Sequence, residues 1–284
     1  MIGVSVLTTA AITEFAETVT AHDGVPPFNE ATLLNLDSRE QRAVFADLET
    51  PVALALGQQL ADGRSEWEFA VLPEYRGRGY GAEFLQQLRD PAGFVVWAHG
   101  DLPAARALAA EQGLTKTRTL FRLLASLGEY DAEEINAKLR QAGLRIRALD
   151  PERDSEAWVS LNARVFASHP EQGSLTTRDL EARLAQPWAD PSAFLVLETP
   201  AGELVGYNWL KLAGDTAEIY VLGVSPDYAG KGLGKLLMFA GLNELVTRGF
   251  REVELYVDGD NTAAVSLYRS LGFETAAVDS QYAG

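Results

Sequence analysis

The spacing of hydrophobic positions is clearest in the second half of the chain. Alternating positions predict strands, and apolar positions three or four residues apart predict helices. The predicted strands cover residues 144–149, 193–198, 204–211, 217–224 and 253–257, with a short final strand. The predicted helices cover residues 155–167, 175–184, 234–248 and 262–271, and a turn is expected at 151–154. The order β-α-α-β-β-β-α-β-α-β predicts an α+β domain with a mixed, mostly antiparallel sheet flanked by helices.

The chain also repeats itself. Residues 71–81 (VLPEYRGRGYG) align without gaps with residues 224–234 (VSPDYAGKGLG), and GDLPAARAL at 100–108 aligns with GDNTAAVSL at 259–267. Upstream, LETP at 48–51 recurs at 197–200. Three matches in the same order indicate two tandem domains of one fold. We place them at 1–140 and 141–284, joined by a short helix that ends at Gly143; the first copy follows the predicted outline less clearly.

Composition narrows the class of protein. The 284 residues are 47% hydrophobic, enough for one large or two modest cores. The formal net charge of −16 is spread over both halves, which argues against a nucleic-acid partner. Cysteine is absent, and no His/Asp/Glu set has metal-ligand spacing, so we expect no disulfide and no metal. Without a long apolar run or a signal peptide, we expect a cytoplasmic monomer with no membrane contact.

The two glycine-rich stretches are candidate phosphate sites. Each follows a predicted strand and opens a predicted helix, so several backbone amides should point into one concavity. Arg76 and Arg78, or Lys231 and Lys235, add positive charge. A Walker P-loop is excluded because no Gly-Lys-Ser/Thr follows at its spacing. A Rossmann fingerprint is disfavoured because the turns come late, after hairpin-like strands.

The remaining match is to a family. Arg76-x-x-Gly79-x-Gly81 resembles the Gln/Arg-x-x-Gly-x-Gly/Ala turn of the GCN5-related N-acetyltransferases (GNAT). Asn261-x-Ala-x-x-Leu-Tyr268 with Leu271-Gly-Phe273 resembles the superfamily's C-terminal acyl-CoA motif. The resemblance implies a tandem GNAT fold and acetyl-CoA as co-substrate. It also implies that the turn amides hold the CoA pyrophosphate, while the preceding strand splays from its neighbour and bonds the pantetheine arm.

The implied acetyl-CoA contacts form two sets. Those of the second copy are Leu222, Gly223, Val224, Ala229, Gly230, Lys231, Gly232, Leu233, Gly234, Lys235, Asn261, Thr262, Ala263, Ala264, Val265 and Ser266. Those of the first copy are Phe69, Ala70, Val71, Arg76, Gly77, Arg78, Gly79, Tyr80 and Gly81. The second copy departs from the motif at Ala229, where Gln or Arg is usual. The first copy could hold a second, non-reacting CoA.

Only the second copy has the groups that acyl transfer needs. The amine must lose a proton, the oxyanion must be stabilised and the leaving thiolate should gain a proton. The resemblance places Tyr268 as the acid for the thiolate and Glu218 as the base for the amine. In the repeat alignment these residues correspond to Ala109 and Ser65, and Asn261 corresponds to Leu102. We therefore expect the first domain to be non-catalytic.

The tandem layout narrows the resemblance. HPEQG at 169–173, IYVLGV at 219–224 and LYVDGDN at 255–261 resemble the mycothiol synthase family. That family transfers the acetyl group of acetyl-CoA to the cysteinyl amine of desacetylmycothiol, a cysteine–glucosamine–inositol conjugate (Cys-GlcN-Ins). The resemblance implies that the acceptor is held by Glu30, Glu171, Lys211, Glu218 and Tyr256, and lies between the two domains.

Two alternatives stay open at this point. A tandem acetyltransferase could act on another small-molecule amine or on a protein N-terminus. A non-catalytic acyl-CoA sensor is the alternative from a different class, although the retained Glu218 and Tyr268 argue against it. The histidines have no assigned role: His169 could cap or pack, and His22 and His99 are expected to be incidental.

Overall fold

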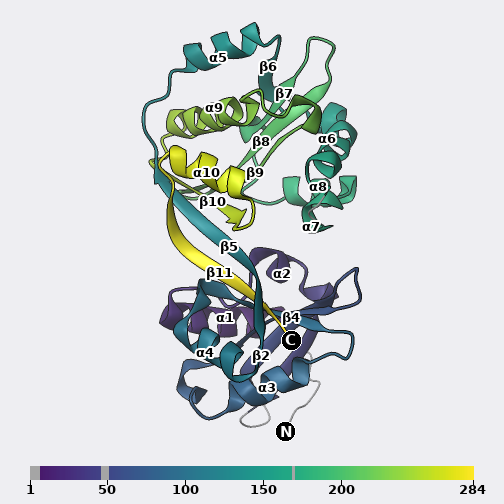
Figure 1. The fold of residues 1–284 in the computed structure, drawn as a ribbon, viewed down its shortest axis with the longest axis vertical. Helices are drawn as coiled ribbons and strands as arrows, with labels where there is room; N and C mark the ends of the chain where they lie inside the picture. The colour runs from purple at the N-terminus through teal and green to yellow at the C-terminus, as the bar shows by residue number, and fades with distance from the viewer. Residues whose placement is uncertain (1–6, 46–50, 168–169) are drawn as a thin grey trace. The chain divides into compact units, whose positions relative to one another are not determined.

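The computed structural model describes residues 7–45, 51–167 and 170–284, and their side chains except those of residues 170 and 171. It forms two compact units (Figure 1). The first contains residues up to 121 with 258–261 and 277–284, and the second contains 122–257 with 262–276. These units group residues by contact, whereas the boundary at 140/141 divides a sequence repeat. That boundary therefore stays a prediction.

The first unit is a sheet with helices on both faces. Its helices are α1 (Thr9–Asp23), α2 (Glu30–Leu34), α3 (Tyr80–Leu88) and α4 (Pro103–Glu111). Its strands run in the order β1 (Glu40–Phe45), β2 (Pro51–Gln59), β3 (Ser65–Val71), β4 (Phe94–Ala98), β11 (Glu274–Ala283) and β5 (Thr115–Ser126). Strands β3 and β4 are parallel, whereas β1–β2, β2–β3 and β4–β11 are antiparallel.

Alternation along β2 explains how this sheet is covered. Leu54 and Leu56 belong to the cluster that α1 completes, whereas Ala53 and Ala55 belong to the cluster of α3 and α4. All four are at most 1% exposed. Since neighbouring side chains of a strand point to opposite faces, one apolar strand serves two cores.

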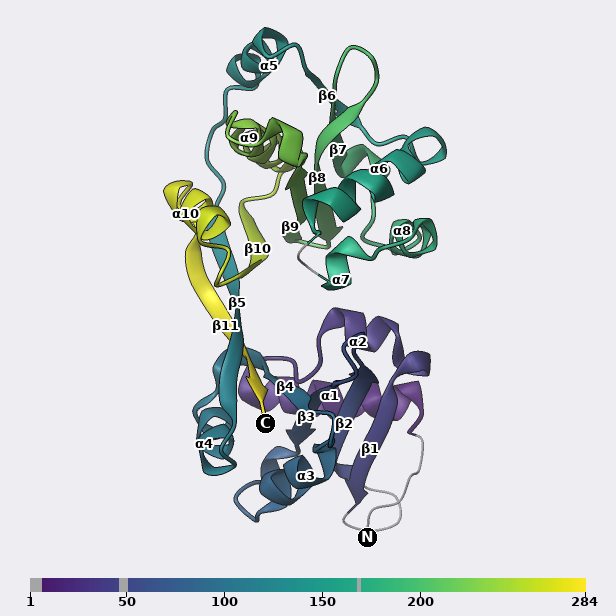
Figure 2. The same cartoon turned by 45° about the vertical axis from the view of Figure 1, so that its right-hand side comes forward.

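The second unit has the same build. Its helices are α5 (Ala132–Gln141), α6 (Pro151–Val165), α7 (Pro170–Gly173), α8 (Thr177–Leu184), α9 (Leu233–Thr247) and α10 (Thr262–Ser270). Its strands β6 (Arg145–Ala148), β7 (Phe194–Glu198), β8 (Leu204–Ala213) and β9 (Thr216–Val224) form an antiparallel series, and β10 (Glu252–Asp258) is parallel to β9. Helices α5 and α9 cover one face, and α6 and α8 cover the other (Figure 2).

Most predicted elements of the second copy are present within a residue or two, but three details were wrong. Residues 151–154 belong to α6, because Asp150 caps a helix that starts at Pro151 and proline is well suited to the first helical turn. The short helix α7 was missed. The final strand is ten residues long; it begins in the second unit and ends in the first, and β5 crosses in the opposite sense.

In each unit, two parallel strands stop pairing before they end. The parallel pairing of β9 with β10 ends at Ile219 and Leu255, although both strands continue to Val224 and Asp258. In the first unit, the pairing of β3 with β4 ends at Glu68 and Trp97, although β3 continues to Val71. Each unit thus has strand backbone that has parted from its parallel neighbour. Among the described residues, no helix combines the length and apolarity of a membrane span.

Candidate active site

The two glycine turns have the same backbone. Gly77 and Gly79 have φ of +71° and +88°, and Gly230 and Gly232 have φ of +74° and +72°. This left-handed region is strained for residues with a Cβ. A Cβ at any of the four would meet no atom within 4 Å, so conformation alone requires glycine and the space before each turn is open.

Each turn leads directly into a helix whose first amides have no side-chain cap. Gly79 and Gly232 are the N-cap residues of α3 and α9, and neither helix has a side chain that caps its first amides. Such amides, at the positive end of the helix dipole, favour an anionic ligand. Both turns therefore have the geometry of a phosphate cradle.

The strand before the second turn has a bulge. Strand β8 pairs Trp209 with Val221 and then Leu210 with Ile219, so Tyr220 is the extra residue on β9. A bulge disrupts the ladder locally and re-aims backbone and side chains, which is common next to active sites. Because it lies between the predicted base, Glu218, and the predicted pantetheine strand, a backbone amide here can face a thioester oxygen.

Glu218 has a defined neighbour. It lies opposite Lys211 across β8 and β9, with 3.6 Å between the Lys211 Nζ and the Glu218 Oε2. Their side chains are 15% and 12% exposed. Nζ also lies 5.2 Å and 5.7 Å from the ring centroids of Trp188 and Tyr220. The structure thus brings together a predicted acceptor contact and the predicted base, in a site with an aromatic wall.

Tyr268 lies on α10 and is nearly buried. It is 8% exposed and packs against Phe273, with 5.9 Å between the ring centroids. Burial raises the pKa of Tyr268 to about 12, so the phenol is protonated at neutral pH. A buried phenol in this state can act as a proton donor but not as a base.

The other predicted residues of the second copy lie on several elements. Leu222, Gly223 and Val224 are on the part of β9 beyond its pairing with β10. Ala229 ends the 3-10 helix Pro226–Tyr228, and residues 262–266 form the start of α10, directly after Asn261. Lys231 and Lys235 lie over Tyr228 and Phe239, with Nζ 4.5 Å and 5.5 Å from the ring centroids.

The predicted acceptor contacts are placed unequally. Glu30 is the first residue of α2 and is exposed. Tyr256 is 46% exposed on β10, just past the end of its pairing with β9. Glu171 belongs to the short helix α7, but its side chain lies outside the described residues, as does His169.

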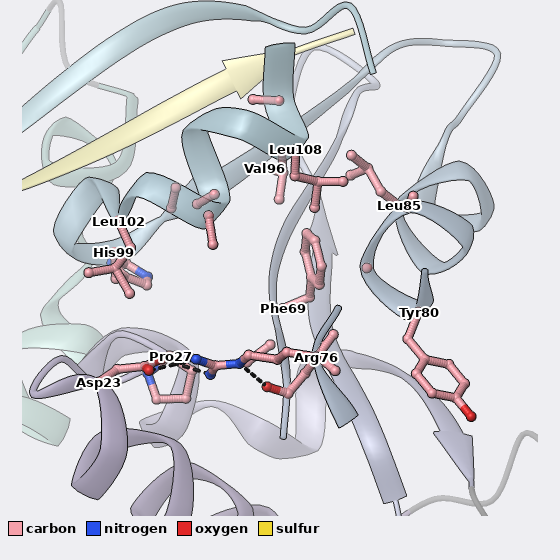
Figure 3. A pocket seen from close by; sticks show the side chains of 18 of the residues that line it. Asp23, Pro27, Phe69, Arg76, Tyr80, Leu85, Val96, His99, Leu102 and Leu108 are labelled. Carbon is pink, nitrogen blue, oxygen red and sulfur yellow. Dashed lines mark hydrogen bonds and ion pairs between the residues drawn. The ribbon is translucent and has the colours of Figure 1, made fainter. Parts of the chain in front are cut away.

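A cavity of about 340 Å³ opens beside the first turn (Figure 3). Its lining includes the predicted residues Phe69, Ala70, Val71, Arg76, Gly77, Gly79, Tyr80 and Gly81. It also includes Ala109, the counterpart of Tyr268. The other counterpart, Ser65, is 1% exposed and accepts a hydrogen bond from the Trp67 indole. The presence of a cavity therefore does not by itself indicate which copy has the predicted acid and base.

Arg76, a predicted CoA contact, lines this cavity and also has partners within the first unit. Its Nη1 and Nη2 bond the two carboxylate oxygens of Asp23 at 2.7 and 2.8 Å, and its Nε bonds the Val71 carbonyl oxygen at 2.9 Å (Figure 3). Hydrogen bonds from Arg76 lower the pKa of Asp23. This pairing fixes the end of α1 against the turn, so the guanidinium has a structural role in this structure.

A buried polar cluster in the first unit was not expected from the sequence. His99, expected to be incidental, lines the cavity, and its side chain is 10% exposed. Its Nδ1 lies 3.1 Å from Asp279 Oδ2 and its Nε2 lies 3.5 Å from Glu68 Oε1. Burial on its own would lower the pKa of His99, but Asp279 and Glu68 outweigh it and raise the pKa to about 10. Nothing local in the sequence joins residues 68, 99 and 279.

A second missed group supports α7. Tyr207 donates to Asn162 Oδ1 at 2.8 Å, and Gln172 of the HPEQG stretch exchanges hydrogen bonds with the same asparagine. Asn162 and Tyr207 are fully buried. A buried Asn must have its hydrogen bonds satisfied, but no local pattern in the sequence links HPEQG with Asn162 and Tyr207.

Comparison with known proteins agrees with this geometry. The acetyltransferase (GNAT) family model matches residues 11–113 and 158–273. A mycothiol acetyltransferase of Clavibacter michiganensis subsp. michiganensis is 45% identical over 277 residues, which covers 95% of this chain and 90% of that protein. Another, from Thermobispora bispora, is 44% identical and covers 96% of this chain and 94% of that protein.

Solved structures show the same fold at low identity. A GCN5-related N-acetyltransferase from Sphaerobacter thermophilus superposes with a TM-score of 0.71 at 21% identity, covering 100% of this chain and 95% of that one. A tandem GNAT protein from the clavulanic acid biosynthesis pathway gives 0.69 at 16% identity, covering 98% and 94%. The predicted tandem α+β fold is confirmed. The chain belongs to the acetyltransferase (GNAT) family and, within it, to the mycothiol acetyltransferases.

Proposed function

We propose that the chain transfers the acetyl group of acetyl-CoA to the cysteinyl α-amine of desacetylmycothiol, in the last step of mycothiol biosynthesis. The observation that supports this most is the Lys211–Glu218 pair beside the β9 bulge, in a chain 45% identical to a mycothiol acetyltransferase. Chemistry is assigned to the second copy, in which Glu218 and Tyr268 are both present.

In the proposed mechanism the chain's own groups move two protons. Glu218 accepts the proton of the attacking ammonium, directly or through one water. The amine nitrogen then bonds the thioester carbon, and a backbone amide at the bulge stabilises the oxyanion. When the carbon–sulfur bond breaks, Tyr268 donates its phenolic proton to the thiolate. The acceptor nitrogen loses its second proton to solvent as the amide forms, and the Tyr268 phenolate regains a proton from solvent. The raised pKa of Tyr268 keeps this proton available at neutral pH.

The acetyl-CoA site is proposed along the second turn. The amides of residues 230–235 face the pyrophosphate, with Lys231 and Lys235 as nearby cations. Leu222, Gly223 and Val224 offer strand backbone to the pantetheine arm, because this segment has no partner in β10. Gly223 has a further reason to be glycine, since a Cβ there would lie 2.7 Å from the Tyr207 ring.

The acceptor is assigned to Lys211, Glu218 and Tyr256 with Glu30 and Glu171. Carboxylates and an ammonium suit an acceptor that presents many hydroxyl groups and one amine. We propose a second, non-reacting CoA in the cavity of the first unit, where the turn is present and the acid and base are replaced by Ala109 and Ser65.

The test is an acceptor panel. Purified protein is incubated with acetyl-CoA and Cys-GlcN-Ins, an aminoglycoside or an N-terminal peptide. Products are followed by mass spectrometry, because Cys-GlcN-Ins has a thiol of its own that would obscure CoA release. Acetylation of Cys-GlcN-Ins in strong preference to the other amines is expected. Turnover of the aminoglycoside or the peptide without turnover of Cys-GlcN-Ins would contradict the proposal.

A further inference from the structure

A buried carboxylate in the first unit is bound to the residue that precedes Glu30. Glu68 lies on β3 and is 3% exposed. Its Oε2 accepts the backbone N–H of Asn29 at 2.9 Å, and its Oε1 accepts the Asn29 side-chain amide. Both oxygens of one buried carboxylate are thus used to hold one loop residue.

Asn29 in turn begins the helix that starts at Glu30. Its side-chain oxygen accepts the Thr32 N–H at 2.8 Å, so it is the N-cap of α2. An N-cap fixes the backbone at the start of a helix. Because α2 has only five residues, a shift of its N-cap would displace the whole helix. The position of the Glu30 backbone is therefore set by Asn29, and that of Asn29 by Glu68.

The other side of Glu68 is also fixed. His99 lies between Glu68 and Asp279, and its ring stacks on Trp97 with 5° between the planes. Asp279 Oδ1 also accepts the Gly100 N–H at 2.7 Å. A buried carboxylate held from both sides has little freedom to move and interacts strongly with its donors.

We propose that Glu68 is a positioning residue for the acetyl acceptor: by holding Asn29 it sets the place of the Glu30 carboxylate. The inference rests on the proposed function, in which Glu30 binds the acceptor. Glu68 does not touch the acceptor or acetyl-CoA in this account. Its effect should therefore appear in the KM for the acceptor and leave the chemical step unchanged.

The sharpest variant is Asn29→Asp. Aspartate remains a good N-cap, so α2 keeps its start, but its carboxylate faces that of Glu68. We expect the KM for Cys-GlcN-Ins to rise about tenfold, while kcat and the KM for acetyl-CoA stay within about twofold. The double variant Asn29→Asp/Glu68→Gln should recover most of the loss, because the new amide can donate to the new carboxylate.

Glu66→Gln is the matched control. Glu66 lies two residues away on the same strand and is 8% exposed. It accepts hydrogen bonds from Gln58, Trp97 and Gln281, and none of these three residues is bonded to Asn29. Glu66→Gln removes a buried carboxylate from the same strand. A general disturbance of this region would therefore raise the KM for the acceptor in Glu66→Gln as well as in Asn29→Asp. We expect the KM for the acceptor to be unchanged in Glu66→Gln.

Measurements in a Glu30→Ala background distinguish the positioning role of Glu68 from acceptor binding by Glu30. There, Asn29→Asp should add no further change to the KM, since the positioned carboxylate is gone. If Glu30→Ala raises the KM and Asn29→Asp does not, or if their effects add fully, the positioning role is overturned. If Glu30→Ala itself leaves the KM unchanged, Glu30 does not bind the acceptor, and that part of the proposed function falls together with this inference.

Discussion

At the first turn, Arg76 occupies the position that the superfamily motif reserves for Gln or Arg, and Asp23 neutralises it; at the second, Ala229 stands there. The turns share left-handed glycines and uncapped helix starts. They differ in what surrounds them, since Ser65 and Ala109 replace Glu218 and Tyr268. In the proposed function, CoA binding and catalysis are therefore separable, and the better motif match belongs to the copy without the proposed acid and base.

The ties between helix and turn also differ. In the first unit a helix carboxylate, Asp23, holds a turn cation; in the second a helix cation, Arg164, lies 3.2 Å from the turn carboxylate of Asp227. The side chains of the second pair are 46% and 72% exposed, so it adds little stability. The first turn is thus braced more firmly than the second.

The largest effect should follow loss of the proposed base. Glu218→Gln keeps the shape of the side chain but cannot accept a proton, so kcat should fall about 10³-fold. Binding of acetyl-CoA, measured by calorimetry, should be unchanged. A loss of less than about threefold in kcat would show that another group takes the proton.

Tyr268→Phe should lower kcat about 10²-fold with acetyl-CoA binding retained. Because burial raises the pKa of Tyr268 to about 12, the wild-type enzyme should lose no activity through this group between about pH 7 and 10. Steady-state kinetics over that range tests both points. An alkaline loss of kcat near pH 9 that disappears in Tyr268→Phe would contradict the assigned environment.

His99→Gln tests how much the charge of His99 contributes to the stability of the first unit. The pKa of His99 is raised from 6.5 to about 10, so the stability that its charge contributes is complete below pH 6.5 and is lost as the pH rises toward 10. At pH 6.5 the variant should lose about 2 kcal/mol of unfolding free energy. Thermal unfolding across this pH range should show the slope in the wild type and a weaker slope in the variant.

A matched glycine pair separates the two cradles. Gly232→Ala strains the second turn and should raise the KM for acetyl-CoA about tenfold. Gly79→Ala makes the same change at the first turn and should leave kcat and KM within about twofold, while removing one of two CoA sites in calorimetry. Equal kinetic effects of the two variants would place chemistry at both turns.

The smallest effect should come from Arg76→Ala. Loss of the Asp23 pair should cost about 1 kcal/mol of stability, since Arg76 is about one-third exposed, and should leave kcat unchanged. Because the pKa of Asp23 is lowered, this contribution is present near neutral pH and is lost in acid. Melting temperatures at pH 7 and at about pH 3 would show the difference between variant and wild type shrink.

The sequence predicted the local structure of the second copy well, because apolar spacing and glycine turns are local signals. It failed at residues 151–154, where proline starts a helix instead of forming a turn. It also underestimated β11, because the end of this strand pairs with β4 of the first unit, and no local pattern reports a partner about 180 residues away. The domain limits 1–140 and 141–284 also stay predictions, because a local pattern does not report contacts between distant segments.

For the site, motifs indicated which residues to consider but not how their side chains are used. The Lys211–Glu218 neighbourhood follows from the register of β8 with β9, which the sequence pattern did not predict. The use of Arg76 by Asp23 and the cluster around His99 depend on contacts between distant segments. In contrast, the repeat alignment alone showed that Ser65 and Ala109 stand at the positions of Glu218 and Tyr268.

Single-turnover transfer tests the central claim most directly. Protein is loaded with labelled acetyl-CoA, the number of bound molecules per chain is measured, and excess Cys-GlcN-Ins is added in a rapid-quench experiment. The account predicts a fast phase of one acetyl group per chain, which is lost in Glu218→Gln and retained in Gly79→Ala. Transfer of two acetyl groups per chain in fast phases, or a full fast phase in Glu218→Gln, would contradict it.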